Sequence, residues 1–285
     1  MITDFVNFCR YTRNLCETTC TSYRHCFQLF SDFCVSRSLD LENVQQKDVL
    51  EFMTEKRRQG VSAASINQYI VAVSAFYDWA VRFRGFRRNP SAGVQKMKTE
   101  KSLPVCVPSH LMKLILDKMP ENTFKELRNK VVVLLGYHCG LRRAEMLALV
   151  DADIDFHAGV IRVFGKGRKV RLVPMSVQLA SLMQLYMSSR PASHFGYDRV
   201  LVTSTNEPLN YDQIAYVVKS ALRPFLPAAL CHCHILRHSF ATACMNAGVS
   251  IESIASLMGH ESVETTMRYL TISSERVRAQ IQGVF

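Results

Sequence analysis

Most of the chain carries apolar residues at the three- and four-residue spacing of amphipathic helices. In the first hundred residues this spacing predicts three helices, over about 21–33, over 46–58, and from about 63 to 83–85. Ser62 stands just before the third, where a serine hydroxyl can accept a hydrogen bond from an N–H group of the first turn. We therefore expect the N-terminal region to be a small all-helical domain.

The helical pattern stops near residue 89. Proline disfavours the α conformation in the residue before it, so Asn89–Pro90 should end the helical geometry. The basic, polar segment that follows contains two further prolines and has the composition of a linker. We predict a helical domain over 1–95, a linker over 96–107 and a second domain over 108–285.

The second domain should be mainly helical, with a small antiparallel β-sheet. Alternating apolar residues predict a hairpin with strands over 160–164 and 169–173, and Lys166 lies at its tip between two glycines. A helix that starts at Ser262 should place Tyr269 beside its apolar face, and a basic tail follows over 275–285. Helical spacing predicts the other elements of this domain over 111–119, 124–138, 142–149, 176–187, 212–222, 234–247 and 250–258.

Charge points to the partner. Lys and Arg number 35 and Asp and Glu 24, which gives a net charge of +11. Both halves of the chain are basic, so neither half is a mere basic tail. Excess positive charge attracts polyanions, which makes nucleic acid the leading candidate partner.

Two features bear on the compartment and on metals. The N-terminus lacks the pattern of a signal peptide, and the apolar run over 131–135 is far shorter than the ~20 residues that cross a bilayer. We expect ten reduced cysteines, a cytoplasmic, nucleoid-associated location and no membrane contact. The segment Cys231–His234 has the composition of a metal site, but its i, i+2 spacing without a second pair does not match zinc sites. We expect no metal and no cofactor.

Several residues could together cleave a phosphodiester. Such a reaction needs a nucleophile, positive groups around the phosphate oxygens, and an acid for the departing oxygen. Arg142 and Arg237 are candidates for the oxygens, because a guanidinium binds them with two parallel hydrogen bonds. Lys166 is a candidate acid, with a pKa that neighbouring positive charge would lower. A tyrosine nucleophile such as Tyr269 needs help to lose its proton.

That help can come from His234 and His260. Each of these residues also has an ordinary interpretation: Lys166 could be a polar turn, His234 and His238 could be a buried pair, and Glu145 could be a surface partner of an arginine. Their combination and order carry the hypothesis.

The order of the motifs resembles that of the tyrosine recombinase and phage integrase family, with an Xer-like size. Five blocks carry the resemblance: Cys139–Glu145, Gly165–Gly167, His234–His238, Leu257–His260, and Tyr269 nine residues later. The resemblance implies a two-domain clamp on DNA, with a helical (SAM-like) core-binding domain before the catalytic domain. It also implies strand exchange through a 3′-phosphotyrosine and a Holliday junction, used in integration or excision, inversion or resolution.

The resemblance also implies roles for single residues. Arg142 and Arg237 would hold the scissile phosphate, and Lys166 would protonate the leaving 5′ oxygen. His234 would act as acid or base and His260 would hydrogen-bond the phosphate, while Tyr269 would be the nucleophile. The supporting residues would be Glu145, which orients the first arginine, and His238. Basic residues expected to contact DNA phosphates are Arg82, Arg84, Arg87, Arg88, Arg168, Lys169 and Arg171.

The partners implied are double-stranded DNA with short inverted-repeat core sites and three further protomers, of this chain or of a related recombinase. The C-terminal tail would make the protomer contacts. Three alternatives stay open: relaxation of supercoils by a type IB topoisomerase-like enzyme, a DNA-binding protein without cleavage, and chromosome dimer resolution as a housekeeping Xer recombinase. The sequence does not reveal the target DNA sequence.

Overall fold

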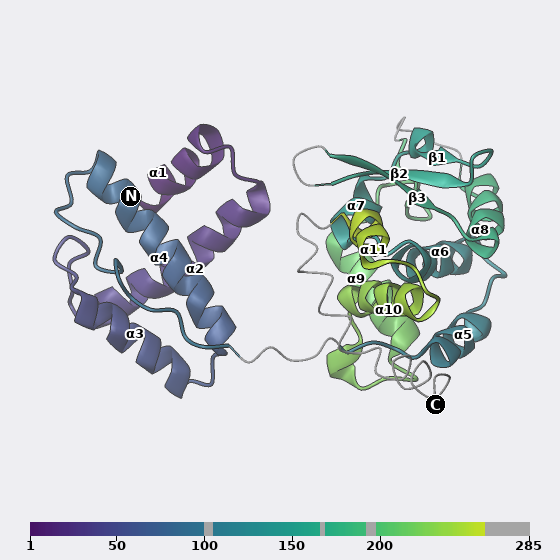
Figure 1. The fold of residues 1–285 in the computed structure, drawn as a ribbon. Helices are drawn as coiled ribbons and strands as arrows, with labels where there is room; N and C mark the ends of the chain where they lie inside the picture. The colour runs from purple at the N-terminus through teal and green to yellow at the C-terminus, as the bar shows by residue number, and fades with distance from the viewer. Residues whose placement is uncertain (100–104, 166–168, 192–197, 260–285) are drawn as a thin grey trace, which may run out of the picture. The chain divides into compact units, whose positions relative to one another are not determined.

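The computed structural model describes residues 1–99, 105–165, 169–191 and 198–259, and its chain divides into two compact units at residues 101 and 102. Both units are mainly helical, and the second adds a small antiparallel sheet (Figure 1). The predicted fold class is therefore confirmed. In the described part of the chain, no helix is long and apolar enough to span a bilayer. All ten cysteines are free thiols.

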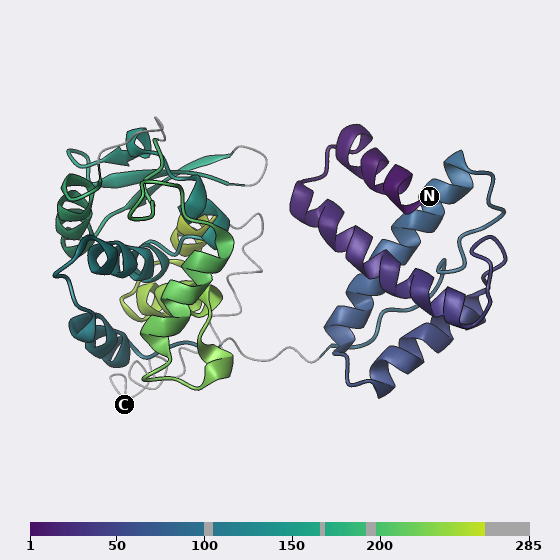
Figure 2. The same ribbon diagram turned by 180° about the vertical axis from the view of Figure 1, so that it is seen from behind.

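The first unit is built around two long helices that cross each other (Figure 2). The ring of Phe27 stacks on that of Phe76 at their crossing, with 3.8 Å between centroids, and both rings are fully buried. Ser62 caps the second long helix by accepting a hydrogen bond from the Ser65 N–H, as predicted. The elements are α1 (Ile2–Asn7), a π-helix (Phe8–Thr12), α2 (Glu17–Ser36), α3 (Gln46–Arg58) and α4 (Ala63–Phe83).

The two N-terminal elements are absent from the sequence-based prediction. Phe5 and Val6 of α1 are each 1% exposed and belong to the aromatic core of this unit. A helix of six residues is too short to be stable by itself or to show a periodic pattern. Its packing against α2 holds it, and packing of that kind cannot be read from a short window of sequence.

Both ends of the predicted linker are attached to a unit. Met97 exchanges two backbone hydrogen bonds with the side chain of Asn67, at 2.8 and 2.9 Å. Val107 is buried, and its N–H donates to the Ser239 hydroxyl at 2.8 Å. Residues 97 and 107, near the two ends of the predicted linker, are therefore each held by hydrogen bonds to a packed unit. Residues 100–104 lie outside the described part of the chain.

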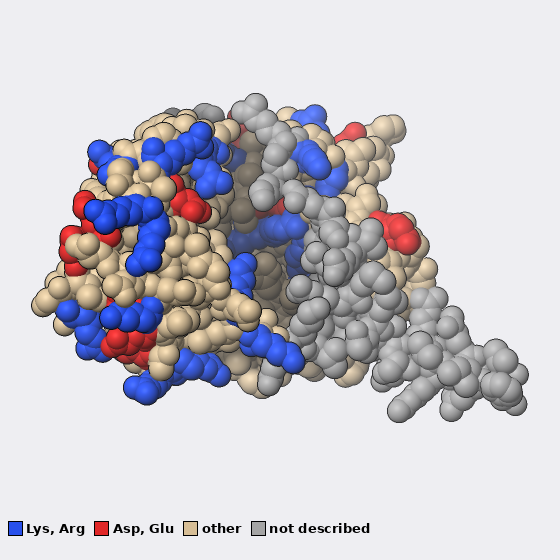
Figure 3. All heavy atoms as spheres, turned by 60° about the vertical axis from the view of Figure 1, so that its left-hand side comes forward, with Lys and Arg blue, Asp and Glu red and all other residues tan. Residues whose placement is uncertain are grey.

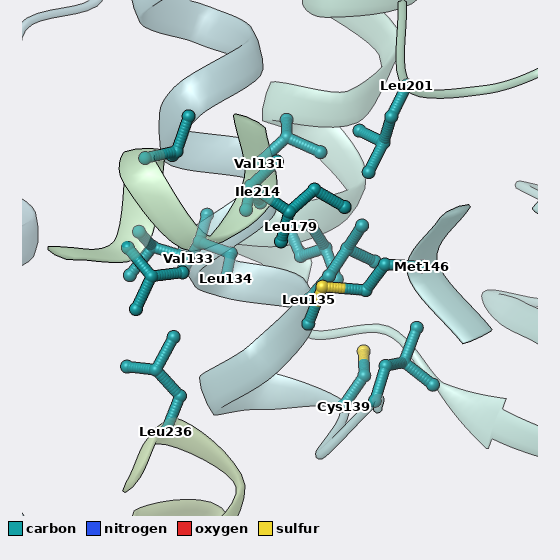
Figure 4. Close-up of a cluster of buried hydrophobic side chains, with 14 of the residues drawn as sticks. Val131, Val133, Leu134, Leu135, Cys139, Met146, Leu179, Leu201, Ile214 and Leu236 are labelled. Carbon is teal, nitrogen blue, oxygen red and sulfur yellow. The ribbon is translucent and has the colours of Figure 1, made fainter. Parts of the chain in front are cut away.

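The second unit packs its helices around α6, which contacts α8, α9 and α10. Figure 4 shows the resulting core, in which Leu134 and Leu135 of α6 lie among Met146, Leu179 and Ile214. The helices of this unit are α5 (Ser109–Lys118), α6 (Phe124–His138), α7 (Arg143–Ala148), α8 (Val177–Ser188), α9 (Tyr211–Leu222), α10 (Cys233–Asn246) and α11 (Ile251–Met258), with 3-10 turns η2 (Asp151–Asp153) and η4 (Ala228–Leu230). Each helix lies within two residues of its predicted bounds.

The sheet has the order β1-β2-β3 and is antiparallel throughout. Its strands are β1 (Ile154–Asp155), which was not predicted, β2 (Val160–Phe164) and β3 (Val170–Pro174). Strands β2 and β3 form the predicted hairpin, and the Gly165 N–H donates to the Lys169 carbonyl at 2.8 Å to close its loop. The helix and tail predicted after Ser262 lie outside the described residues.

Candidate active site

A sharp turn after α6 places Arg142 at the start of α7. Gly140 has φ +61°, a left-handed backbone conformation that residues other than glycine rarely adopt. Arg142 is the N-cap of α7, and its N–H donates to Glu145 Oε2 at 2.8 Å. The Arg142 side chain turns to the same carboxylate and donates from Nη1 to Oε1 at 2.8 Å. The predicted pairing of Glu145 with the first arginine is thus present.

Glu145 is buried at the centre of three arginines. Its side chain is 6% exposed, and Arg171 donates to its two oxygens at 3.0 and 2.8 Å. Arg237 Nη1 lies 4.0 Å from Oε2. Burial raises the pKa of Glu145, but the hydrogen bonds from Arg171 and Arg142 outweigh that effect and hold the pKa below its usual value. One negative charge therefore faces three positive charges, and the excess of about two can attract an anion.

Arg237 joins two turns of this site. It lies inside α10 with 5% of its side chain exposed, and it donates to the Gly140 carbonyl and to the Met258 carbonyl. Arg142 reaches the same end of α11, because its Nη2 donates to the Gly259 carbonyl at 3.2 Å. The two candidate phosphate-binding arginines thus come together although they are 95 residues apart in sequence.

Both arginines and His234 line one pocket. Its volume is about 480 Å³, and it also includes basic side chains of α9 and of the segment before α10. His238 is one helical turn beyond His234, with 6.4 Å between the ring centroids, and does not line this pocket. The lining residues are Leu141, Arg142, Arg143, Ala215, Tyr216, Lys219, Cys231, His232, Cys233, His234 and Arg237.

His234 should be neutral at physiological pH. Partial burial lowers its pKa below the ordinary 6.5, and the positive charges of His232, Arg237 and Arg142 lower it further. A neutral imidazole can accept a proton, and it takes one up only when the pH falls below 6.5. We expect the single-turnover rate of DNA cleavage to be flat between pH 8 and 6.5 and to fall only at lower pH.

The control for this prediction is His234→Gln, which should cleave more slowly and whose rate should fall only at a lower pH than in the wild type, where Glu145 becomes protonated. A pH–rate profile of both proteins decides the matter. A decline that sets in above pH 6.5, or one that begins at the same pH in the glutamine variant, would assign the titrating group elsewhere.

The Gly140 turn offers a stability test. A Cβ at residue 140 would lie 2.4 Å from Cδ1 of Phe240, in addition to the left-handed strain. We expect Gly140→Ala to lower the free energy of unfolding by about 2–4 kcal/mol in urea denaturation. Gly159 has φ +67° with no atom within 4 Å of an added Cβ, so Gly159→Ala should cost only about 1–2 kcal/mol. Equal losses in the two variants would show that contact with Phe240 is unimportant.

Four predicted site residues lie outside the described part of the chain: Lys166, Arg168, His260 and Tyr269. The structure does describe the residues that border the segments in which they lie. Gly165 and Lys169 flank the loop of Lys166, and Gly259 precedes His260 directly. Strand β3 and helix α11 contact each other next to the arginines. The structure therefore fixes the ends of two segments that carry predicted catalytic residues.

Most of the expected phosphate contacts are exposed. This holds for Arg82, Arg87, Arg88 and Lys169, and also for Arg84, which pairs with Asp4. Figure 3 shows one face of the molecule, on which Lys and Arg side chains are more prominent than Asp and Glu.

Arg171 differs from this expectation. Its side chain is 10% exposed, and Glu145 and the Leu257 carbonyl take up its hydrogen bonds. Its guanidinium is therefore part of the arginine cluster and does not lie on the exposed surface, where the prediction placed it. The strand alternation carries a signal for this, because Arg171 lies on the same face of β3 as the buried Val173.

Two family models match this chain. The model described as "Phage integrase family" matches residues 107–276, and the one described as "Phage integrase, N-terminal SAM-like domain" matches residues 2–83. Among curated proteins, the tyrosine recombinase XerC of Staphylococcus aureus (strain bovine RF122 / ET3-1) is 28% identical over 275 residues, which is 96% of this chain and 92% of that protein. XerC of strain USA300 is 27% identical over the same length.

Solved structures share the fold. The XerH recombinase bound to a palindromic difH substrate, a post-cleavage complex, matches with a TM-score of 0.78 at 19% identity and covers 99% of this chain and 84% of its own. The Tn1549 transposon integrase in complex with circular intermediate DNA matches with a TM-score of 0.71 at 22% identity, covering 94% of each chain. A lambda integrase dimer bound to a core site matches at 0.71 and 15% identity, over 94% of this chain and 75% of that one.

Proposed function

Because the chain belongs to the phage integrase family, we propose that it is a tyrosine-type site-specific recombinase whose active site is organised by Arg142, Arg237 and Glu145. One observation carries the proposal: a single buried carboxylate holds three arginines beside a pocket of about 480 Å³. A phosphodiester is an anion, and its charge grows when a nucleophile attacks. Fixed guanidinium groups stabilise that charge without first having to reorganise.

The chemistry balances with the residues of this chain. The Tyr269 hydroxyl attacks the scissile phosphorus, and His234 accepts the phenolic proton. The bond to the 5′ oxygen breaks, and Lys166 gives that oxygen a proton. The products are a 3′-phosphotyrosyl ester and a free 5′ hydroxyl. Attack by another 5′ hydroxyl reverses these steps and rejoins the DNA, so no ATP is needed.

The remaining residues assist these steps. Arg142 and Arg237 bind the non-bridging oxygens, and His260 donates a further hydrogen bond to the phosphate. Glu145 orients Arg142, as its two hydrogen bonds with that residue support. His238 supports His234 from the next turn of α10.

The proposed substrate is duplex DNA with short inverted-repeat core sites. We assign residues 1–95 to DNA binding, 96–107 to a linker and 108–285 to catalysis, with a tail that contacts a neighbouring protomer. Four protomers, of this chain or with a related recombinase, would exchange strands through a Holliday junction. The palindromic substrate of the similar XerH complex supports an inverted-repeat site. Two sites in direct orientation would give excision or resolution, and two in opposite orientation would give inversion.

A plasmid assay tests this proposal. Supercoiled plasmids that each carry a pair of fragments from the source genome are incubated with the protein and a chelator, without nucleotide, and new junctions are sequenced. We expect reciprocal junctions that converge on one core sequence. Relaxed plasmids without junctions would indicate a topoisomerase, and unchanged plasmids across the whole genomic set would contradict recombination.

A further inference from the structure

Arg171 has the environment of a structural arginine, yet it lies among the residues proposed for catalysis. Its Nη1 and Nη2 donate to the two oxygens of Glu145, and its Nε donates to the Leu257 carbonyl at 2.7 Å. It is thus bound by two hydrogen bonds to the residue that holds Arg142, and by one to the end of α11. A lysine has a single nitrogen at its tip and cannot reproduce this fork.

The end of α11 is held by three arginines from three different elements. The carbonyls of consecutive residues accept one hydrogen bond each: Leu257 from Arg171, Met258 from Arg237, and Gly259 from Arg142. The last carbonyls of a helix have no partner within it and carry partial negative charge, so cations are favourable there. This arrangement fixes the backbone one residue before His260.

Gly259 permits this close approach. It has φ +61°, and a Cβ built on it would lie 3.0 Å from Nη1 and 3.3 Å from Cζ of Arg171. The guanidinium therefore packs against the backbone of the turn that leads to His260. Arg171 also follows the Lys166 loop in sequence, so its hydrogen bond to the Leu257 carbonyl links strand β3 to the end of α11.

We propose that Arg171 is a positioning residue for strand cleavage: it ties the strand after the Lys166 loop to Glu145, and through Glu145 to Arg142, and it ties both to the end of α11. It acts through these residues and does not contact DNA. The inference rests on the proposed function, because it concerns the same site. It replaces the surface role that the sequence predicted for Arg171.

The charge balance around Glu145 gives this role a pH signature. Among the described residues, the charged groups that face Glu145 are Arg142 on its own element, Arg171 from β3 and Arg237 from α10. Hydrogen bonds from Arg171 help to hold the pKa of Glu145 below its usual value in spite of burial. Without Arg171 that pKa should rise, so Glu145 should become protonated, and release Arg142, at a higher pH than in the wild type.

The test compares four single variants in single-turnover formation of a covalent protein–DNA adduct on a nicked suicide substrate, together with DNA binding across a salt series. The pH profile of Arg171→Gln is measured in a His234→Gln background. Arg171→Gln removes the fork, and Arg171→Lys keeps a charge only. Arg162→Gln is the control. Arg162 on β2 also pairs with a buried acid, Asp153, with 3.1 Å between Nε and Oδ1, but it does not line the pocket. Lys169→Ala is the reference for loss of an exposed phosphate contact.

We expect Arg171→Gln to slow adduct formation about 100-fold or more, with Arg171→Lys in between. The dependence of its DNA affinity on salt should match the wild type. In a His234→Gln background, where Glu145 sets the loss of rate at low pH, Arg171→Gln should lose rate from a higher pH than His234→Gln alone. Arg162→Gln should cleave like the wild type. Lys169→Ala should instead lower the slope of log K against log salt by about 0.9.

Three results would overturn the inference: wild-type rates in Arg171→Gln, a fall in its salt slope like that of Lys169→Ala, or an unshifted pH profile in the His234→Gln background. Circular dichroism checks folding, and if Arg171→Gln is unfolded, the rate and pH profile of Arg171→Lys decide by the same criteria. A wild-type protein that forms no adduct would overturn the proposed function itself, whereas an active wild type beside an equally active Arg171→Gln would overturn this inference alone.

Discussion

Arg237→Lys should form the covalent DNA adduct about 1,000-fold more slowly than the wild type, with DNA affinity changed only a few-fold. Loss of one fixed donor to a developing oxyanion costs roughly 100- to 1,000-fold in other enzymes. Arg237 also holds the Gly140 and Met258 carbonyls at the same time. A lysine keeps the charge but cannot bind both carbonyls and a phosphate oxygen, so the geometry is lost with the charge intact.

The matched control is Arg190→Lys. Arg190 also binds an acid and a carbonyl at once, Asp151 and Arg199, but it does not line the pocket. This variant should lose some stability and cleave at the wild-type rate. If Arg190→Lys slowed cleavage as much as Arg237→Lys, loss of any buried arginine fork would explain the effect. Near wild-type cleavage by Arg237→Lys would remove Arg237 from the active site.

Glu145→Ala should have the largest effect on stability. The side chain is 6% exposed and is the acid shared by Arg142 and Arg171, with Arg237 at 4.0 Å. Its removal leaves buried positive charge uncompensated, which costs roughly 3–5 kcal/mol in comparable cases. We expect a loss of that size in urea denaturation, and no detectable adduct because Arg142 is no longer oriented.

Glu126→Ala provides the comparison. Glu126 occupies the same capping position at the start of α6, where it accepts hydrogen bonds from the N–H groups of Asn122 and Thr123. Within the described part of the chain, no arginine forms an ion pair with it. Its loss should cost about 1 kcal/mol. The difference between the two losses in the free energy of unfolding measures how much pairing with the arginine cluster contributes to stability. A difference below about 1 kcal/mol would mean that Glu145 serves only as a helix cap.

The long helices and the hairpin strands were predictable because the spacing of their buried apolar residues repeats within each element. Helices α3 and α6 begin and end at the predicted residues, and the hairpin strands differ by one residue at most. The N-terminal α1 was missed because its stability comes from Phe5 and Val6 packing into a core assembled by distant segments. A window of six residues contains no trace of that packing.

The sequence indicated which residues belong to the candidate site, but not which way each side chain points. The motifs group Arg142, His234 and Arg237, and these three residues line one pocket. Charge alone grouped Arg171 with Lys169, although the Arg171 side chain is largely buried on β3 and Lys169, in the loop just before that strand, is exposed. The carbonyls of α11 that accept from the arginines could not be found from the sequence, because every residue has such a group and only the fold selects which ones meet a guanidinium.

The most direct measurement is covalent trapping. Wild-type protein, Tyr269→Phe and Tyr216→Phe are incubated with a nicked genomic library of the source in a chelator, denatured, and digested, and the DNA that stays attached is sequenced. Tyr216 is 69% exposed and lines the same pocket, so it controls for any accessible tyrosine. We expect attached DNA that shares one core sequence, from the wild type and Tyr216→Phe but not from Tyr269→Phe. An adduct that persists in Tyr269→Phe, or no adduct from the wild type, would contradict a phosphotyrosine mechanism at Tyr269.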